Sequence, residues 1–281
     1  MGGGGDAIFQ PSLRVTGKHW EDLTRRGLAF IVMQWRNFFP IARISLRRQN
    51  RRSVFMPVKI AQVEKRFASP GPHPNGLQAS ADGLWCIDQG NDRLYRQDYE
   101  TGEVLFDVKT DTVKSSGITV GGGYVWIAST YERKIAQLDA ETGRTVAKYC
   151  SPGAGVVAWR EGAADAQETG AHGLEWRDGR LFVASPPSQM VHVMDPDGWQ
   201  EVHSIRVPGL RVHGIAWSED GKLWAADTSA GTVCLLDPES GRIFDVIRVE
   251  APDEVHGMTI HEGVLWFCNA ETCDIGRLLV A

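Results

Sequence analysis

Signatures of several common enzyme classes are absent from this sequence of 281 residues. It contains no Gly-x-Ser-x-Gly, no Gly-x-x-x-x-Gly-Lys and no His-Glu-x-x-His, so the usual sequence evidence for a serine nucleophile, a phosphate-binding loop or a zinc protease is missing. The apolar stretch from Gly27 to Leu46 is interrupted by Arg36 and Arg43 and is too broken to span a bilayer. We therefore expect no membrane partner.

Cysteine is scarce, and its five residues are an odd number that does not pair into a disulfide framework. Cys268 and Cys273 have four residues between them and no second cysteine pair, so a structural zinc site is not expected. The chain also shows no charged and then apolar leader that ends in small residues. These features predict a reduced, cytoplasmic protein.

Charge is unevenly distributed along the chain, whose net charge is −5. Residues 1–55 hold ten Lys and Arg against three acids, which gives this segment +7 and the rest −12. The cluster Arg47, Arg48, Arg51 and Arg52 could suit an anionic surface, but the segment lacks the repeats described below. We expect residues 1–55 to be an extension outside the main domain, or the product of a start site placed too far upstream. A nucleic-acid partner is not expected.

Five copies of one pattern run through the remaining residues, and each copy opens with glycine and an apolar residue. These pairs are Gly76-Leu77, Gly117-Ile118, Gly173-Leu174, Gly214-Ile215 and Gly257-Met258. About eight residues later comes a short apolar run, such as Leu84–Asp88, and then a third strand pattern that ends in a turn such as Asp98–Gly102. Four short strands in about 40 residues are typical of a propeller blade. The sequence therefore predicts an all-β fold, a five-bladed β-propeller over residues 56–281.

The glycines also locate an insertion and the closure of the ring. Their spacings are 41, 56, 41 and 43 residues, so about fifteen extra residues precede the third copy, between Ala154 and Gly170. The fifth copy ends one strand short, whereas Val58–Phe67 has the alternation of a fourth strand. We expect this N-terminal strand to complete the last blade, because an unpaired edge would otherwise remain. The insertion is expected to overhang the central mouth.

Histidine marks the candidate site. In a propeller, the loops that enter the first strands and those that join the second and third strands surround one central mouth. His172, His213 and His256 each precede the opening glycine, so ring closure should bring them together. Imidazoles gathered in this way can bind a metal or exchange protons near neutral pH. The alternative is that His-Gly is only part of the repeat, with each ring bonded to a neighbouring backbone carbonyl.

Other polar residues are expected on the same loops and therefore in the same substrate pocket. His73 lies on the loop that enters the first blade. Asp88, Ser129 and Asp227 end second strands, and Glu168 lies in the insertion, four residues before His172. The predicted ligand is a small molecule.

Several segments resemble the repeat of the streptogramin lyase (virginiamycin B lyase) family, over roughly residues 70–281. They are Gly71–Leu77, Val255–Met258, Leu265–Phe267 and Asp274–Leu278. More specific is Glu254-Val255-His256, which is similar to the family's Glu-x-His. The resemblance implies that Glu254 binds magnesium, that His256 is a general base, and that His213 contacts the substrate.

The chain also departs from this family in two respects. The family's second metal-binding glutamate corresponds to Asn269, and Glu271 follows two residues later. The family also has seven blades, whereas this chain has five repeats.

Three hypotheses follow for the function. The first is a metal-assisted lyase of the β-elimination type, in which His256 removes a carbon-bound proton and His213 and His172 orient the substrate or protonate the leaving group. A divalent ion, magnesium by resemblance, would be held by Glu254 with Glu271 or Asn269; a transition metal bound by histidines alone is the next candidate. The second is an aminoacyl (glutaminyl) cyclase, since plant-type cyclases are also five-bladed. The third is a non-catalytic binding propeller. The sequence leaves the oligomeric state open and is compatible with a monomer.

Overall fold

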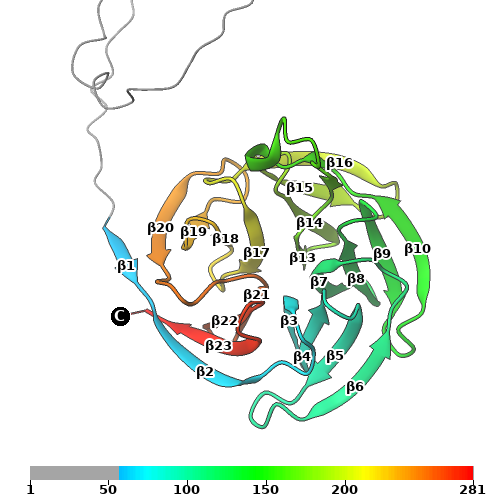
Figure 1. The fold of residues 1–281 in the computed structure, drawn as a ribbon, viewed down its shortest axis with the longest axis horizontal. Helices are drawn as coiled ribbons and strands as arrows, with labels where there is room; N and C mark the ends of the chain where they lie inside the picture. Colours follow the sequence, from blue (N-terminus) through cyan, green and yellow to red (C-terminus); the bar gives the residue numbers. More distant parts are fainter. Residues whose placement is uncertain (1–56, 281) are drawn as a thin grey trace, which may run out of the picture. The chain divides into compact units, whose positions relative to one another are not determined.

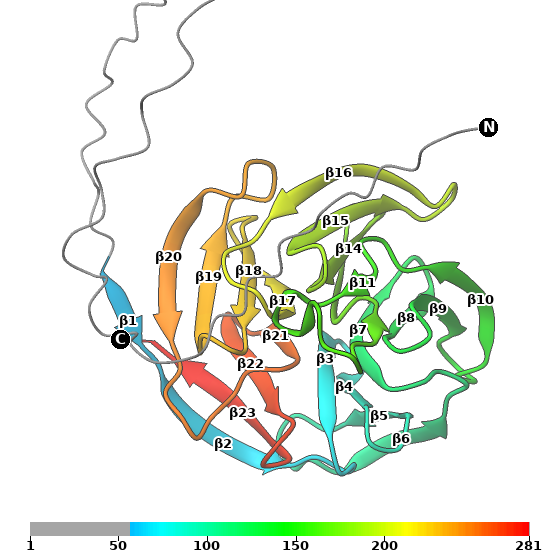
Figure 2. The same cartoon turned by 45° about the horizontal axis from the view of Figure 1, so that its top comes forward.

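The computed structural model describes residues 57–280, which form five antiparallel blades around a common axis (Figures 1 and 2). This confirms the predicted five-bladed β-propeller. The predicted extension at residues 1–55 lies outside the described residues and stays a prediction. Within residues 57–280, no helix has the length and apolar character needed to cross a bilayer.

Each blade follows the repeat, from an inner strand next to the axis to an outer strand at the rim. Blade 1 comprises β3 (Pro74–Ser80), β4 (Gly83–Asp88), β5 (Arg93–Gln97) and β6 (Val104–Lys109). Blade 2 comprises β7 (Ser115–Gly121), β8 (Tyr124–Ser129), β9 (Lys134–Asp139) and β10 (Thr145–Cys150). Blade 3 comprises β13 (Gly173–Arg177), β14 (Arg180–Ser185), β15 (Met190–Asp195) and β16 (Gln200–Arg206). Blade 4 comprises β17 (Val212–Trp217), β18 (Leu223–Asp227), β19 (Thr232–Leu236) and β20 (Ile243–Arg248). Blade 5 comprises β21 (Met258–His261), β22 (Val264–Asn269), β23 (Asp274–Leu279) and the N-terminal β2 (Gln62–Ala68).

The ring closes as the sequence predicted, because β2 pairs antiparallel with β23 and supplies the missing outer strand. The predicted single strand Val58–Phe67 is nevertheless two strands. Its first part, β1 (Val58–Ile60), pairs parallel with β20 of blade 4, and the chain crosses to blade 5 at the buried Ala61. The N-terminal segment therefore joins two neighbouring blades and does more than complete one (Figure 1).

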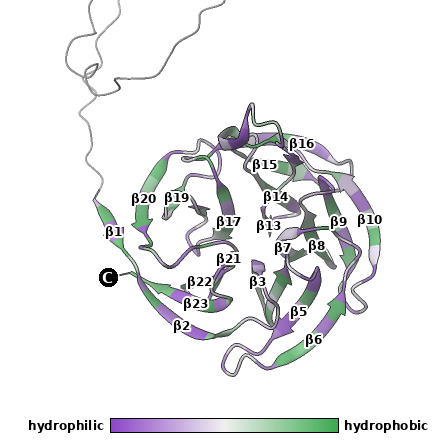
Figure 3. Ribbon diagram, viewed as in Figure 1, coloured by the Kyte–Doolittle hydropathy of each residue, from purple (hydrophilic) through white to green (hydrophobic). Residues whose placement is uncertain are grey.

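The apolar core consists of the five interfaces between neighbouring blades. The aromatic residues at equivalent positions of the second strands fill these interfaces, and they are Trp85, Trp126, Phe182, Trp224 and Trp266. Outer strands such as β2 and β6 mix hydrophobic and hydrophilic residues, because one of their faces meets solvent (Figure 3). Packing of each blade on the next fixes the direction in which its inner strand faces the axis.

The opening glycine of each repeat is a steric requirement of the axis. A Cβ at Gly117 would lie 2.7 Å from the carbonyl oxygen of His172, and one at Gly214 would lie 2.7 Å from that of His256. The other three opening glycines are crowded in the same way by the neighbouring blade. Only about 10 Å³ remains on the axis here, room for about one water molecule at most. We call this layer the glycine collar; it comprises Gly76, Gly117, Gly173, Gly214 and Gly257.

Beyond the glycine collar lies a layer of buried polar side chains from the inner strands. Thr119 Oγ1 donates a hydrogen bond to Gln78 Oε1 at 2.7 Å, and Thr259 Oγ1 accepts the backbone N–H of Ala79 at 3.0 Å. Glu175 occupies the equivalent position in blade 3 and is only 5% exposed. Burial raises the pKa of its carboxyl to about 8, an effect that the backbone N–H of Trp176 partly offsets. Glu175 is therefore protonated at neutral pH.

The buried Glu175 carboxyl makes folding stability depend on pH. The unfolded chain releases this proton near pH 4.5, whereas the folded protein holds it up to about pH 8. Its contribution is therefore complete below pH 4.5 and is lost as pH rises to 8, by up to about 1.4 kcal/mol per pH unit. We expect Glu175→Gln to equal the wild type in urea unfolding near pH 4.5 and to exceed it at pH 8. An equal difference at both pH values would contradict this.

Candidate functional site

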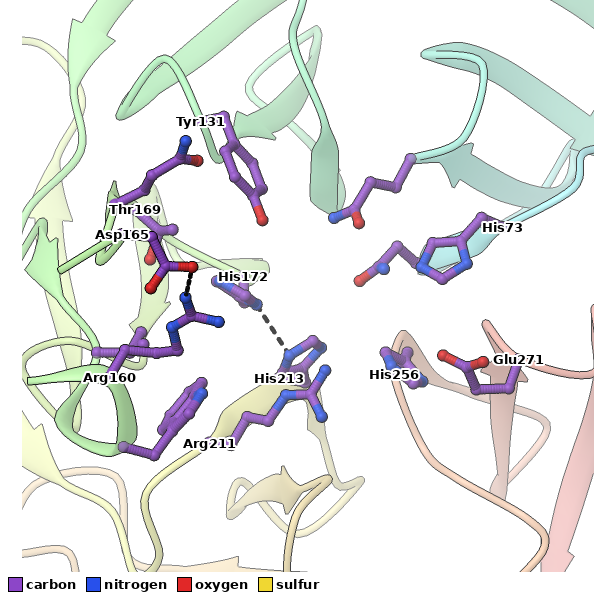
Figure 4. A pocket seen from close by; sticks show the side chains of 15 residues that line it. His73, Tyr131, Arg160, Asp165, Thr169, His172, Arg211, His213, His256 and Glu271 are labelled. Atoms are coloured by element: carbon purple, nitrogen blue, oxygen red, sulfur yellow. Dashed lines mark hydrogen bonds and ion pairs between the residues drawn. The ribbon is translucent and has the colours of Figure 1, made fainter. Parts of the chain in front are cut away.

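A cavity of about 570 Å³ opens at the end of the axis where the chain enters the inner strands (Figure 4). Residues from all five blades line it, together with the segment between β10 and β13 that contains the predicted insertion (Ala154 to Gly170). We call this segment, residues 151–172, the insertion loop. This loop contains β11 (Gly155–Val156), the short 3-10 helix η1 (Ala158–Arg160) and β12 (Glu168–Thr169). Its residues Val157, Trp159 and Gln167 line the mouth, as the sequence predicted for the insertion.

The glycine collar positions the histidines. Each collar glycine lets the inner strands approach the axis, so the preceding side chain lies at the rim of the collar and faces the mouth. In the order of the blades, these side chains are Asn75, Ser116, His172, His213 and His256. Four of the five, all except Ser116, line the cavity. The residues that precede the opening glycine in the five repeats therefore form a ring of polar side chains around the axis.

His213 lies between the other two imidazoles and contacts both. His172 Nδ1 and His213 Nε2 share a hydrogen bond of 2.9 Å, in which the N–H group of one ring is the donor and the bare nitrogen of the other is the acceptor (Figure 4). The His213 and His256 rings are nearly perpendicular with centroids 5.0 Å apart, and His73 packs edge-on to His256 with centroids 6.3 Å apart. The alternative in which each ring merely bonds a backbone carbonyl does not describe His172 and His213, because these rings bond each other.

All three central imidazoles are held neutral. Burial lowers the pKa of His172 to about 3, and the positive charge of Arg211 adds to the effect. Burial, with smaller contributions from Arg211 and His73, also lowers the pKa of His256 to about 3. The pKa of His213 is lowered well below its usual value, first by burial and then by the neighbouring rings and Arg211. Neutral imidazoles are ready to exchange protons without first losing one.

His256 has two defined neighbours. The backbone N–H of Ala270 lies 3.5 Å from Nδ1, the upper limit of a hydrogen bond, so it fixes the tautomer only weakly. Nε2 lies 3.9 Å from the carboxylate of Glu254, whose side chain is 41% exposed. Because water screens Glu254, its charge does not reverse the effect of burial on His256.

Sequence reasoning missed several residues of the lining. Arg211, Tyr131, Gln89 and Arg160 all line the cavity. Glu271, which the sequence had suggested as a metal ligand, also lines it, near His73 and His256 (Figure 4). A signal for Arg211 was present, because Arg211-Val212-His213 has the same register as Glu254-Val255-His256.

Polar residues at the ends of the second strands lie outside this lining, although the sequence suggested them for the substrate pocket. Asp88 accepts the backbone N–H groups of His73 and Asn91, and Asp227 accepts those of Leu210, Arg211 and Ala230. Ser129 accepts the N–H of Val113 at 2.8 Å and donates to Glu132. These side chains fix the loops of the mouth without facing its cavity.

The insertion loop also departs from expectation at one residue. Glu168 is exposed and pairs with Arg133, whereas its neighbours Gln167 and Thr169 line the cavity. Successive residues of an extended chain point to opposite sides, so Glu168 faces away from the histidines. Of the pocket residues suggested by the sequence, His73 does line the cavity.

The oxygen donors expected for a metal do not form a metal site. The amide oxygen of Asn269 is occupied by the backbone N–H groups of Glu271 and Thr272, at 3.0 and 3.2 Å. Glu271 lines the cavity, whereas Glu254 does not. Within residues 57–280, no three His, Cys, Asp or Glu side chains are grouped so that they could hold an ion. The donor set suggested for magnesium, and a site of histidines alone, therefore do not fit this arrangement.

A hydroxyl–imidazole–carboxylate chain lies outside the cavity. Ser188 Oγ is 2.9 Å from His192 Nε2, and His192 Nδ1 is 2.8 Å from Glu201 Oε2. The backbone of Gly153 covers Ser188 and His192 so closely that even a Cβ at residue 153 would overlap both. Blade 1 makes the equivalent contact between Asn91 and Tyr95 at 2.9 Å. We therefore interpret this chain of contacts as an anchor of the insertion loop.

Comparisons with known proteins agree on the fold. The family model of the anaphase-promoting complex subunit 4 WD40 domain matches residues 191–266. Glutaminyl cyclase from Myxococcus xanthus is 13% identical, with a TM-score of 0.65 over 80% of this chain and 98% of that chain. A streptogramin B lyase structure is 17% identical, with a TM-score of 0.50 over 79% of this chain and 98% of that chain. No curated protein sequence matches. The resemblance seen in the sequence thus reappears in the structure, as a shared β-propeller fold.

Proposed function

We propose that this chain is an enzyme that transfers protons on a small molecule bound in the central cavity, and that the reaction is a β-elimination. The observation that supports this most directly is the cluster of His172, His213 and His256, three neutral imidazoles in contact at one cavity. Similarity of fold to a glutaminyl cyclase and a streptogramin B lyase favours an enzyme over a scaffold.

His256 is the proposed proton acceptor. This role uses the tautomer with a bare Nε2, in which Nδ1 carries the hydrogen and gives up its 3.5 Å contact with the backbone N–H of Ala270. Nε2 then takes a proton from the carbon next to an electron-withdrawing group. The C–H electron pair forms the new double bond, and the bond to the leaving group breaks with its electrons. Glu254, 3.9 Å from Nε2, lies beside the imidazolium that results, although water screens its charge.

The leaving group receives its proton from the pair formed by His172 and His213. Because these two rings share one hydrogen bond of 2.9 Å, a proton given up by one can be replaced through the other. No step requires a metal, in keeping with the donor arrangement described above. His256 then releases its proton to the solvent, and the pair of His172 and His213 takes up one proton from the solvent, which restores the starting state.

A glutaminyl cyclisation is the second candidate, favoured by the match to nearly the whole length of the bacterial cyclase. In that reaction an amine attacks an amide carbonyl and ammonia leaves, which also needs one group to accept a proton and another to donate one. The imidazole cluster offers both roles.

The reaction class can be tested by mass spectrometry on a panel of cyclic depsipeptides, β-substituted carboxylates and peptides with N-terminal glutamine. Elimination that opens a cyclic ester leaves the mass unchanged and creates a double bond, and elimination from a β-substituted carboxylate removes the substituent. Hydrolysis adds one water, and cyclisation removes one ammonia. We expect the elimination products, at the same rate after dialysis against a chelator. Ammonia loss alone would replace the lyase by the cyclase, and unchanged substrates across the panel would favour the binding scaffold.

A further inference from the structure

Arg211 brings a positive charge into the cavity. Its backbone N–H donates to Asp227 Oδ2 at 3.0 Å, which fixes the residue at the mouth just before β17. Within residues 57–280, its guanidinium forms no ion pair, although it lines the cavity beside His213 (Figure 4). The other cavity arginine, Arg160, is paired with Asp165 at 2.7 Å. A half-buried guanidinium without a counter-ion is a candidate binding site for an anion.

The same cavity holds a buried polar group without a partner. Asn75 is only 2% exposed and its Oδ1 has no hydrogen-bond partner in the described part of the chain. Leaving such a group unpaired costs about 1–3 kcal/mol. A ligand that carried an N–H or O–H group beside its anion would satisfy Asn75 as well as Arg211. Two independent features of the lining thus call for a polar ligand.

The position of Arg211 also connects anion binding to the imidazoles. Its charge helps to lower the pKa of His172, His213 and His256. An anion that neutralised Arg211 would remove this contribution and make the rings more basic. Binding of an anionic ligand would therefore raise the basicity of His256 while the ligand is in the cavity.

We infer that Arg211 binds a carboxylate of the substrate, so that the substrate is a small organic acid with a hydrogen-bond donor. A planar carboxylate matches the two parallel donors of a guanidinium. The inference rests on the proposed function in one respect: the carboxylate belongs to the molecule whose proton His256 accepts. It deepens that proposal by naming the substrate class.

Binding of succinate and of inorganic phosphate tests this without any turnover. Calorimetry would compare the wild type with Arg211→Gln, Arg211→Lys and Arg206→Gln. Arg206 is the matched control, because it lies on the outer strand β16, away from the cavity lining, and its side chain donates to Gln189 Oε1 at 3.1 Å. We expect Arg211→Gln to weaken succinate about ten- to a hundredfold, Arg211→Lys to weaken it less, and Arg206→Gln to change nothing.

A second readout excludes an indirect effect of misfolding. In imidazole NMR titrations, succinate should raise the pKa of His213 in the wild type and leave it unchanged in Arg211→Gln. Equal succinate affinity in wild type and Arg211→Gln, or tighter binding of phosphate than of succinate, would overturn the inference. Because these are binding measurements, succinate binding without elimination would refute the proposed reaction alone. Elimination without Arg211-dependent binding would refute the inference alone.

Discussion

A chain that begins at Ser69 is expected to lose its cooperative unfolding transition, whereas one that begins at Met56 should melt like the full chain. The first truncation removes β2, which pairs along the whole of β23 and brings Glu64 within 2.6 Å of Arg277. Without it, blade 5 ends in an open edge beside the buried Ile275 and Leu278. The last blade then holds only three strands, and its packing on both neighbours is weakened.

A third truncation, beginning at Ala61, separates the two N-terminal strands. It removes β1, whose three residues are exposed, but keeps β2. We expect a small decrease in melting temperature, because β1 only extends the edge of blade 4. Thermal melting followed by circular dichroism would rank the three chains. If the chain that begins at Ser69 melted as late as the one that begins at Met56, ring closure by β2 would not matter for stability.

Replacing His256 with alanine is expected to lower kcat about 10²- to 10⁴-fold on the substrate found by mass spectrometry, the usual effect of losing a general base. The fold should persist, since the side chain borders the cavity and its loss removes no apolar residue from the blade interfaces. His203→Ala is the matched control, because His203 lies on the outer strand β16 and bonds the carbonyl of Pro238 at 3.2 Å. Steady-state kinetics and a thermal melt of each variant would measure both effects.

The pH profile gives the same prediction a second test. In the protein without substrate, the pKa of His256 is about 3. Protonation of this ring should therefore not lower kcat/KM between about pH 8 and pH 5. An ordinary exposed histidine would titrate within that range. Wild-type rates in the His256→Ala variant, or an acid limb near pH 6.5 that this variant abolishes, would show that the assignment is wrong.

Much of the fold was predictable because the same strand pattern occurs in each of the five repeats. The His-Gly register, the aromatic residues of the second strands and the missing last strand are local patterns, and five copies outweigh the ambiguity of one. The division of Val58–Phe67 into β1 and β2 was not predictable. Alternation shows that a segment is a strand, but the choice between β20 and β23 as its partner depends on contacts about 200 residues away.

The site was predictable only where geometry follows from register. His172, His213 and His256 lie together because the collar glycines repeat. Asp88 and Asp227 were expected to face the ligand, but they accept backbone N–H groups of the loops. An aspartate at the end of a strand can either face a ligand or accept backbone N–H groups, and the sequence is the same in both cases. The geometry of the following turn determines which of the two occurs. Arg211 was not predictable in the same way, because the position two residues before the histidine carries opposite charges in blades 4 and 5, Arg211 and Glu254.

The glycine collar also determines the route that a ligand takes. Since about 10 Å³ remains on the axis at that level, nothing larger than about one water molecule passes from one end of the ring to the other. The substrate and product of the proposed reaction would therefore share the entrance bordered by Trp159 and Tyr131. In the proposed reaction, each product molecule therefore has to leave past the insertion loop before the next substrate molecule enters.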